Sequence, residues 1–450
     1  MGRLFGTDGI RGVANSELTA ELAFRTGRSG AYVLTKAMGN KRPVILIGKD
    51  TRKSGDMLEA ALTAGLCSVG AKVIPLGIIP TPAVAYLTRY YKADAGVVIS
   101  ASHNPYEYNG IKFFNSSGYK LSDEIENEIE EYILEEKVIE DLPTHGKIGY
   151  ICENHSAVDD YVNFAVSTID CRLDDLKVVI DCANGASYQT AFLALNKLGA
   201  NVEAIHNTPD GKNINNMCGS THMESLQAYV TSIGADIGIA FDGDADRMLA
   251  VDENGKLIDG DVLMAICADY MKKQGTLDKD TLVATVMSNL GLFIAGEKLG
   301  INVESTKVGD RYVLERMLEG GFKIGGEQSG HIIFLDHNTT GDGLISALQF
   351  LAILKKTGQK ASEAAKIVNI LPQVLYNAHI RPENKNKYME VPEIKEACSA
   401  LEAEFEGNGR VLIRPSGTEP LVRVMIEGSD IEYIDKKAKE LSELIEKLLG

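Results

Sequence analysis

The sequence predicts an α/β protein: three similar α/β domains with mixed, mainly parallel sheets, followed by a C-terminal α+β domain. Short β-rich runs alternate with helix-like stretches from residue 18 to about 355. This alternation is typical of parallel sheets whose strands are joined by crossover helices. A strand-start signal recurs three times in the same region, and a different order of elements begins near residue 369.

The first elements are read from periodicity and from their end signals. The runs 43–47 and 176–180 are short and β-rich, as strands are. The stretches 54–70, 184–199 and 289–299 have helical spacing, and each is closed by a Gly. Strands and helices of these lengths alternate as crossover units require.

An internal repeat supports three α/β units. Three segments each close a helix and begin a strand: Gly70-Ala71-Lys72-Val73, Gly199-Ala200-Asn201-Val202 and Gly300-Ile301-Asn302-Val303. A second match relates 93–100 to 235–242, so the loops that follow these two runs share one structural position. That position is the carboxyl end of a strand, where α/β sheets bind ligands. Residues 326–331 follow a third run in the same way.

The end of the chain has another organisation. After Pro372 the order becomes strand, helix, strand, strand, helix, without a further copy of the repeat. A length of 450 residues predicts about three domains of average size. We therefore expect four modest domains, at 1–152, 153–255, 256–368 and 369–450.

Composition restricts the class of protein. The chain is 44% hydrophobic and 24% charged, and it has no apolar run near the ~18 to 20 residues of a membrane span. The first residues do not resemble a signal peptide, so a cytoplasmic protein is expected. Seven Cys without a C-x-x-C pair favour reduced thiols over a disulfide framework or a zinc site. A net charge of −17 argues against nucleic acid as a partner.

Two loops predict metal-assisted phosphoryl transfer. Ser102 lies in the run Ser100 to Pro105, and Asp242, Asp244 and Asp246 alternate along a later loop. Alternate carboxylates can converge on one hard cation beside a hydroxyl. We expect the Ser102 hydroxyl to lie on a surface loop. Lys112 lies on the next strand, and its side chain is expected to reach the same site. An EF-hand is the alternative for the Asp run, but Arg247 stands where that motif requires Gly.

Three further segments are candidates for binding an anion. Residues 414–420 combine Arg, Ser, Gly and Thr, which suits a phosphate cradle, although a plain surface turn is the alternative. Residues 6–12 hold Arg11 between glycines, which is unusual for a flexible tail. His331 ends the third loop of the repeat, although a structural role is the more common one for any single His.

Five motifs carry a family resemblance, and they occur in this order: Gly6 to Gly12, Ser100 to Pro105, Asp242 to Arg247, Gly326 to His331 and Arg414 to Pro420. Together they resemble the α-D-phosphohexomutase superfamily over essentially the whole chain. Within it, the first motif, Ala245, residues 286–289 and the fourth motif most resemble bacterial enzymes that act on glucosamine phosphates.

The resemblance implies four domains around one central cleft, with Ser102 active as phosphoserine. It implies one Mg²⁺ per subunit, held by the Ser102 phosphate with Asp242, Asp244 and Asp246. It further implies exchange of glucosamine 6-phosphate and 1-phosphate through a 1,6-bisphosphate, which would supply UDP-N-acetylglucosamine and cell-wall precursors. A sugar 1,6-bisphosphate, or phosphorylation of Ser102, would activate the enzyme. The expected partner is a sugar phosphate, without nucleic acid or membrane, and a homodimer is left open.

By the same resemblance, Lys112 and His331 move the proton on the attacking and leaving oxygens, in an order left open. Arg11 and Arg247 stabilise the charge of the phosphoryl group. A larger set of residues is expected to bind the sugar hydroxyls and the phosphate that is not transferred. They are Glu327, Ser329, Arg414, Ser416, Gly417, Thr418 and Arg423.

Two other readings remain at this point. A phosphomannomutase or phosphoglucomutase of the same superfamily would differ only subtly in its sugar pocket. A metal-dependent phosphatase or a non-catalytic sugar-phosphate binder is less consistent with the residues. A phosphatase has no use for a second phosphate cradle at Arg414, and a binder does not need Ser102.

Overall fold

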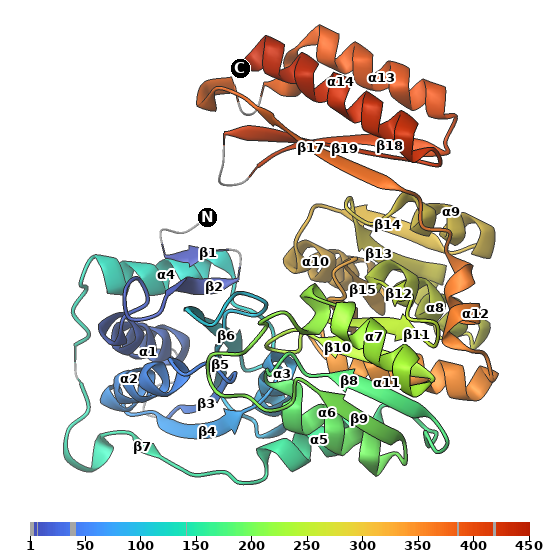
Figure 1. The fold of residues 1–450 in the computed structure, drawn as a ribbon. Coiled ribbons are helices and arrows are strands. Elements are labelled where there is room, and N and C mark those ends of the chain that lie inside the picture. Colours follow the sequence, from blue (N-terminus) through green and yellow to red (C-terminus); the bar gives the residue numbers. More distant parts are fainter. Residues whose placement is uncertain (1–3, 7, 37–41, 141, 385–386, 417–419) are drawn as a thin grey trace. The chain divides into compact units, whose positions relative to one another are not determined.

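The structure is a computed structural model that describes residues 4–6, 8–36, 42–140, 142–384, 387–416 and 420–450 (Figure 1). The chain forms two compact units. One comprises residues 1–287 and 301–366, and the other comprises 288–300 and 367–450. The first unit contains three sheets with helices, and the second contains one sheet.

The first sheet has seven strands in the order β1-β2-β6-β5-β3-β4-β7. β3 pairs in parallel with β4 and β5, while β5 and β6 run antiparallel. Its buried core includes Ile45, Ile47 and Val97 from the strands and Leu58 and Leu62 from α2. The bounds are β1 Phe5–Gly6, β2 Gly9–Val13, α1 Ala20–Thr35, β3 Val44–Lys49, α2 Gly55–Ser68, β4 Lys72–Ile78, α3 Thr81–Tyr90, β5 Ala95–Ile99, β6 Tyr108–Asn115, α4 Asp123–Leu134 and β7 Tyr150–Ile151.

The second sheet has the order β12-β11-β10-β8-β9. β8 pairs in parallel with β9 and β10, and β11 is antiparallel to β10. The bounds are α5 Ala157–Ser167, β8 Lys177–Asp181, α6 Ser187–Lys197, β9 Asn201–Ile205, α7 Glu224–Ile233, β10 Ile237–Phe241, β11 Met248–Asp252 and β12 Leu257–Ile258. The segment from Met248 is therefore a strand, as expected, and not the second half of an EF-hand loop.

The third sheet has the order β14-β13-β15-β16, with parallel pairing of β13 to β14 and β15 and antiparallel pairing of β15 to β16. The bounds are α8 Gly260–Lys273, β13 Thr281–Thr285, β14 Asn302–Thr306, α10 Asp310–Gly320, β15 Ile324–Gly326, β16 Ile332–Phe334, α11 Gly343–Thr357 and α12 Ala361–Ala364.

The repeat read from the sequence is present in all three sheets. In each, a parallel strand (β5, β10 or β15) is followed by a loop and an antiparallel neighbour (β6, β11 or β16). The helix-closing glycines of the repeat have left-handed φ values: +92° at Gly70, +86° at Gly199 and +66° at Gly300. A side chain is strained there, so Gly ends the helix and starts the strand. The expected α/β fold class is confirmed.

The second unit is an antiparallel sheet in the order β17-β19-β18 with two long helices. Its elements follow the predicted order strand, helix, strand, strand, helix. Helix α9 belongs to this unit, because the buried carboxylate of Glu427 accepts hydrogen bonds from the Asn289 side chain and from the Leu290 N–H, both at 3.1 Å. The bounds are α9 Leu290–Leu299, β17 Gln373–His379, α13 Pro392–Phe405, β18 Gly409–Pro415, β19 Leu421–Gly428 and α14 Ile431–Leu449.

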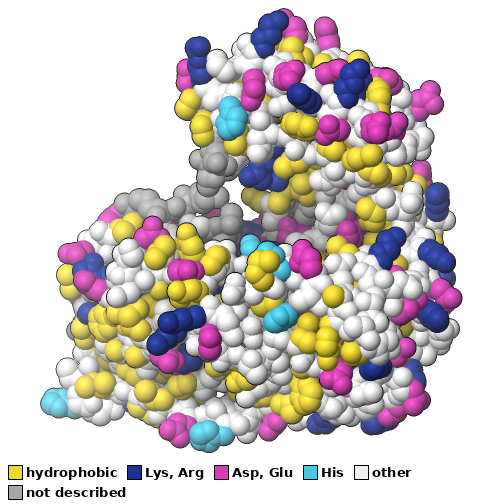
Figure 2. Space-filling model, in the orientation of Figure 1, with side chains coloured by type: hydrophobic (Ala, Val, Ile, Leu, Met, Phe, Trp, Pro, Cys, Tyr) yellow, Lys and Arg dark blue, Asp and Glu magenta, His cyan; other side chains and the backbone are white. Residues whose placement is uncertain are grey.

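The surface agrees with the charge balance. Figure 2 shows acidic and basic side chains interspersed on the face drawn, rather than gathered into one basic patch. Among the described residues, no helix combines the length and the apolar character needed to cross a bilayer.

Candidate active site

Ser102 lies in the loop between β5 and β6, in a left-handed backbone conformation with φ of +51°. It is only 2% exposed, so the expectation of a surface hydroxyl is wrong. The residue is buried because the loop after β10 covers it. From that loop the Asp242 carboxylate accepts a hydrogen bond from the Ser102 hydroxyl, with 2.7 Å between Oγ and Oδ2.

The backbone of Ser102 is held from two sides. The Arg52 guanidinium, on the loop after β3, donates to the Ser102 carbonyl at 3.1 Å, and the Asn215 side-chain amide donates to the same oxygen at 2.9 Å. Both side chains also donate to the carbonyl of Asn104. Arg52 is in turn paired with the buried Asp50. These contacts fix an otherwise unfavourable backbone conformation.

The carboxylates of Asp242, Asp244 and Asp246 converge as predicted. Each is at most 6% exposed, and one oxygen from each lies within 4.8 Å of the other two. The chain turns between them at Ala245, where φ is +56°. Thr81, at the start of α3, donates its hydroxyl to Asp244 at 2.7 Å. A helix that packs on the first sheet therefore contacts the aspartate loop of the second.

The electrostatics of this cluster suit a cation. Burial, followed by repulsion from Asp246 and Asp244, raises the pKa of Asp242 well above its usual range. Asp244 and Asp246 each have one buried oxygen, Oδ1, that accepts no hydrogen bond within the described parts of the chain. Converging, unsatisfied carboxylate oxygens are the donor set that Mg²⁺ prefers. The residues present therefore fit a hard divalent cation.

Lys112 lies on β6 and points to the same cluster, as predicted. Its ammonium is 2.8 Å from Asp8 and 3.1 Å from Asp244. Burial opposes the charge, but these two carboxylates prevail and raise the pKa of Lys112. Lys120 contacts Asp8 at 2.7 Å and Asp310 at 2.5 Å, which adds a second, half-buried cation. The carboxylates keep both lysines charged.

His331 follows the third strand-end loop and lies between two carboxylates, 3.5 Å from Asp246 and 3.6 Å from Asp310. Burial disfavours its charged form, yet Asp246 and then Asp310 raise its pKa overall. The Gly341 N–H donates to Nε2 at 3.1 Å, which places the ring proton of the neutral form on Nδ1, facing Asp246.

Among the remaining predicted residues of the first unit, Arg11, Arg247 and Glu327 line one cavity of about 560 Å³, and Ser329 does not. Its lining includes Arg11, His103, Arg247, Glu327 and His331, together with other residues from all three sheets. Glu327 accepts from the Gly309 N–H at 3.1 Å and lies 3.4 Å from the Ser329 hydroxyl. The structure thus brings together the expected loops of the three α/β units.

In the second unit, Arg414 on β18 is opposite Arg423 on β19. Burial and the charge of Arg423 both lower the pKa of Arg414. Ser416 is buried, and its N–H donates to the Leu421 carbonyl at 2.9 Å. Gly417 and Thr418 lie outside the described residues. A pair of guanidinium groups beside a loop hydroxyl suits an anion with several oxygens.

Comparisons with known proteins decide the family. Models of the phosphoglucomutase/phosphomannomutase alpha/beta/alpha domains I, II and III match residues 2–140, 158–255 and 259–370, and the model of the C-terminal domain matches 379–444. The chain belongs to the phosphoglucomutase/phosphomannomutase family.

Individual members of the phosphoglucomutase/phosphomannomutase family match over the full length. The phosphoglucosamine mutase of Acetivibrio thermocellus is 64% identical over 450 residues, all of both chains. That of Ruminiclostridium cellulolyticum is 63% identical over 448 residues, 99% of each. A family protein from Burkholderia thailandensis shares the fold, with a TM-score of 0.81 at 24% identity, covering 100% of this chain and 99% of its own. The N-acetylphosphoglucosamine mutase of Aspergillus fumigatus, solved with GlcNAc-6P and magnesium, gives 0.70 at 17% identity, covering 100% and 96%.

Several residues at this phosphohexomutase site were missed by sequence reasoning. Arg52, Asn215, Lys120 and Asp310 lie outside the five motifs, yet each contacts a motif residue. Two of them carried a usable signal: Arg52 follows β3, and Asp310 follows β14, each just beyond the carboxyl end of a parallel strand. Asn215 and Lys120 had none, because their contacts depend on how the sheets pack.

Proposed function

We propose that the protein interconverts glucosamine 6-phosphate and glucosamine 1-phosphate, as a phosphoglucosamine mutase. The observation that carries the chemistry is the Ser102 hydroxyl, 2.7 Å from Asp242 in a buried centre of converging carboxylates. Full-length identity of 64% and 63% to curated phosphoglucosamine mutases supports the choice of sugar.

In the proposed reaction Ser102 carries the phosphoryl group as phosphoserine. The phosphorus–oxygen bond to Ser102 breaks as a new one forms to the free sugar hydroxyl, whose proton is taken up by a neighbouring base. The resulting 1,6-bisphosphate turns round, and its other phosphoryl group returns to Ser102 while the released sugar oxygen regains a proton. Catalysis of this kind is mainly positioning and charge stabilisation.

The chain's own residues divide these tasks. Lys112 stays charged between Asp8 and Asp244, so we assign it to stabilising and protonating the oxygen that leaves rather than to base catalysis. The ring of His331, with Gly341 N–H on its Nε2, is the better candidate to exchange a proton. Arg11 and Arg247 line the cavity and would stabilise the charge of the phosphoryl oxygens.

Asp242, Asp244 and Asp246, with the phosphate on Ser102, would hold one Mg²⁺ per subunit. That ion would neutralise charge on the transferring phosphoryl group. Burial, and then repulsion from Asp246 and Asp244, raises the pKa of Asp242, and a bound cation would favour its charged form. A sugar 1,6-bisphosphate would prime an enzyme that lacks phosphate on Ser102.

We assign the sugar hydroxyls and the second phosphate to two separate groups of residues. Glu327 would bind sugar hydroxyls in the cavity, together with Ser329, whose hydroxyl lies 3.4 Å from the Glu327 carboxylate. Arg414, Ser416, Gly417, Thr418 and Arg423 would bind the phosphate that is not transferred. The domain boundaries at 152, 255 and 368 form part of the same proposal, as do a cytoplasmic location and a homodimer. Free thiols at all seven described cysteines suit a reducing compartment.

The test compares glucosamine, glucose and mannose 6-phosphates, each with a catalytic amount of its 1,6-bisphosphate. We expect the highest kcat/KM with glucosamine 6-phosphate, and a margin of only about 1–3 kcal/mol over a sugar that differs by one group. A preference for mannose phosphate would reassign the substrate within the family. Formation of inorganic phosphate instead of isomer, with no bisphosphate requirement, would favour a phosphatase.

A further inference from the structure

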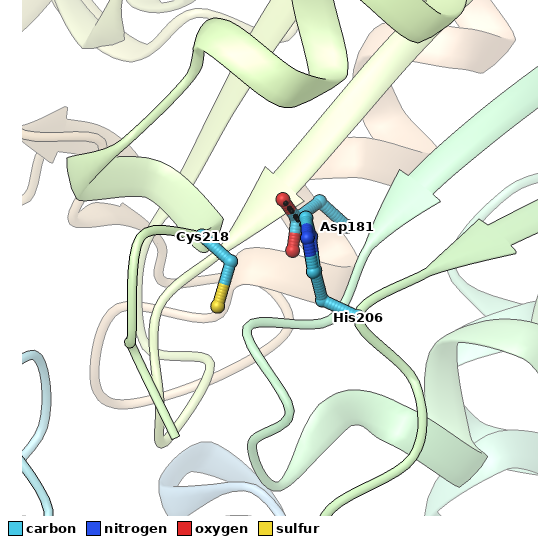
Figure 3. A group of neighbouring side chains, drawn as sticks. All are labelled: Asp181, His206 and Cys218. Atoms are coloured by element: carbon cyan, nitrogen blue, oxygen red, sulfur yellow. Dashed lines mark hydrogen bonds and ion pairs between the residues drawn. The ribbon is translucent and has the colours of Figure 1, made fainter. Parts of the chain in front are cut away.

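A second cluster of potential metal ligands lies in the second sheet, apart from the aspartates that contact Ser102. Asp181 ends β8, His206 follows β9, and Cys218 precedes a short helical turn at Gly219–Thr221. One ligand atom from each lies within 4.8 Å of the other two. Figure 3 shows the His206 ring against the Asp181 carboxylate, with Cys218 arriving on a separate loop. None of the three contacts Ser102 or the catalytic aspartates in any hydrogen bond described above.

The geometry of this cluster is fixed before any ion arrives. The Asp181 carboxylate lies 2.9 Å from His206 Nδ1 and accepts the N–H groups of Ala183 at 2.9 Å and Gly219 at 3.0 Å. The Asn184 side chain lies 3.9 Å from the sulfur of Cys218. Asp181 and Cys218 are fully buried. Three segments are thus tied together around one carboxylate.

We propose that Asp181, His206 and Cys218 bind a zinc-like divalent cation. A thiolate, an imidazole and a carboxylate are the mixed ligand set of zinc sites, whereas the all-oxygen set at Asp242 to Asp246 suits Mg²⁺. Three protein ligands leave a fourth position for water. The His206 side chain is 30% exposed, which gives the ion a route from solvent.

Binding requires a change of protonation at the sulfur. Burial and the Asp181 charge raise the pKa of Cys218 to about 12, so the free site holds a neutral thiol. On coordination the sulfur–hydrogen bond breaks, the proton passes to solvent, and the electron pair forms the bond to the metal. The proton on His206 Nδ1, which faces Asp181 at 2.9 Å, also leaves, either to solvent or by transfer of the ring proton to Nε2. The freed nitrogen lone pair and the Asp181 carboxylate then each form a bond to the same ion.

The bound ion would act on a segment that reaches the active site. Residues 213–219 carry both Cys218 and Asn215, and the Asn215 N–H donates to the Ala183 carbonyl at 2.9 Å. The Asn215 side chain in turn holds the Ser102 carbonyl at 2.9 Å. An ion bound to Cys218 therefore cross-links residues 213–219 to the ends of β8 and β9. It stabilises the loop that supports Ser102 and takes no part in catalysis.

The proposal is tested with Co²⁺ as a probe on the full chain, after chelation and in excess Mg²⁺ so that the aspartate cluster is saturated. We expect one Co²⁺ per chain, a thiolate-to-cobalt absorption band, and loss of that band when one equivalent of Zn²⁺ is added. Cys218→Ser and His206→Ala should each abolish the band, whereas Cys67→Ser, at a half-buried cysteine on α2 and outside this cluster, should retain it.

A second readout keeps the test independent of mutase activity. Because Zn²⁺ would bind only the folded chain, it should raise the Tm of the wild type and of Cys67→Ser, but not of His206→Ala. The exposed His206 variant serves if Cys218→Ser does not fold. Absence of the band, its persistence in both site variants, or an equal Tm rise in His206→Ala would overturn the proposal. None of these outcomes bears on whether Ser102 carries the phosphoryl group.

Discussion

Two groups of cations in this chain differ in how their charge is balanced. Around Ser102, Lys112 and Lys120 each touch carboxylates, and Asp8 contacts both. On β18 and β19, Arg414 is opposite Arg423, and a second cation is the neighbour that perturbs it. Matched charges hold a geometry before any ligand arrives, whereas two neighbouring like charges gain most when an anion binds. This difference agrees with the proposed roles, in which the first region (the prepared region) carries out the chemistry and the second binds a phosphate.

The largest effect is expected from Ser102→Ala. Removing the phosphoryl carrier should lower kcat by about three orders of magnitude or more. Intact mass should also lose the species that is about 80 Da heavier. Folding should survive, because a single hydrogen bond contributes about 1 kcal/mol. Turnover at the wild-type rate would refute the role of Ser102 in the prepared region.

Asp244→Asn removes one charge from the same centre. Mg²⁺ affinity, measured by titration of activity and by calorimetry, should fall by more than the about 10–100-fold that is lost when a residue hydrogen-bonded to a metal ligand is substituted. Asp252→Asn is the matched control: Asp252 is equally buried, but its carboxylate only accepts the N–H groups of Asn254 and Lys256. Equal losses in the two variants would mean that the aspartate loop is structural.

Arg414→Ala tests the other side of the comparison. Charge-assisted hydrogen bonds contribute about 1.5–3 kcal/mol, so kcat/KM should fall by about 10 to 100-fold, with a higher KM and a lower kcat. The exposed Arg381, in the same unit, provides Arg381→Ala as a control with unchanged kinetics. If Arg414→Ala matches the wild type at sub-saturating substrate, the arginine pair does not bind the second phosphate.

Asn215→Ala and Arg52→Lys test the hydrogen bonds that hold the backbone of Ser102 in place. Each removes part of the grip on the Ser102 carbonyl, and a shift in the phosphoserine position should lower kcat by about tenfold with little change in KM. Asn216→Ala, at an exposed neighbour, should change neither. A rise in KM instead would place these residues in substrate binding.

The smallest expected effect is on stability and comes from Glu126, which lines a pocket together with Asp310. Burial, and then repulsion from Asp123, raise its pKa to about 7. Above pH 4.5 the unfolded chain loses this proton before the folded chain does, so the stability of the wild type falls as pH rises to 7. Glu126→Gln removes that loss and should be more stable than the wild type at pH 8, by about 1 kcal/mol because the site is half exposed.

The two proteins should be equally stable near pH 4, which denaturant titrations at both pH values would show. An identical pH dependence in Glu126→Gln and the wild type would contradict the raised pKa.

The local sequence pattern was sufficient to predict the fold and three of the loops at the site. The loops at Ser102, Asp244 and His331 each follow a buried strand, and strand, helix and turn signals are properties of short segments. The C-terminal order was readable for the same reason. Which loops face one another depends on packing between sheets, and no short segment encodes that.

The residues that escaped prediction show this limit. Ser102 was expected at the surface, because its burial comes from a loop 140 residues later in the chain. Arg52 and Asn215 reach Ser102 from two different sheets. Cys218 could not be recognised from cysteine spacing, since its neighbours Asp181 and His206 end two other strands. In each case the residues that contact one another in the structure are far apart in the sequence.

The contact between Ser102 and Asp242 also sets a time order during synthesis. When a ribosome has made the first 152 residues, the Ser102 loop exists, but Asp242 and Asn215 do not. At about 5–20 residues per second, the 140 residues between the two partners take roughly 7 to 28 s to make. During that interval the hydroxyl has none of its later carboxylate neighbours. The carboxylate cluster beside Ser102 is thus complete only after the second sheet has been made and has folded against the first.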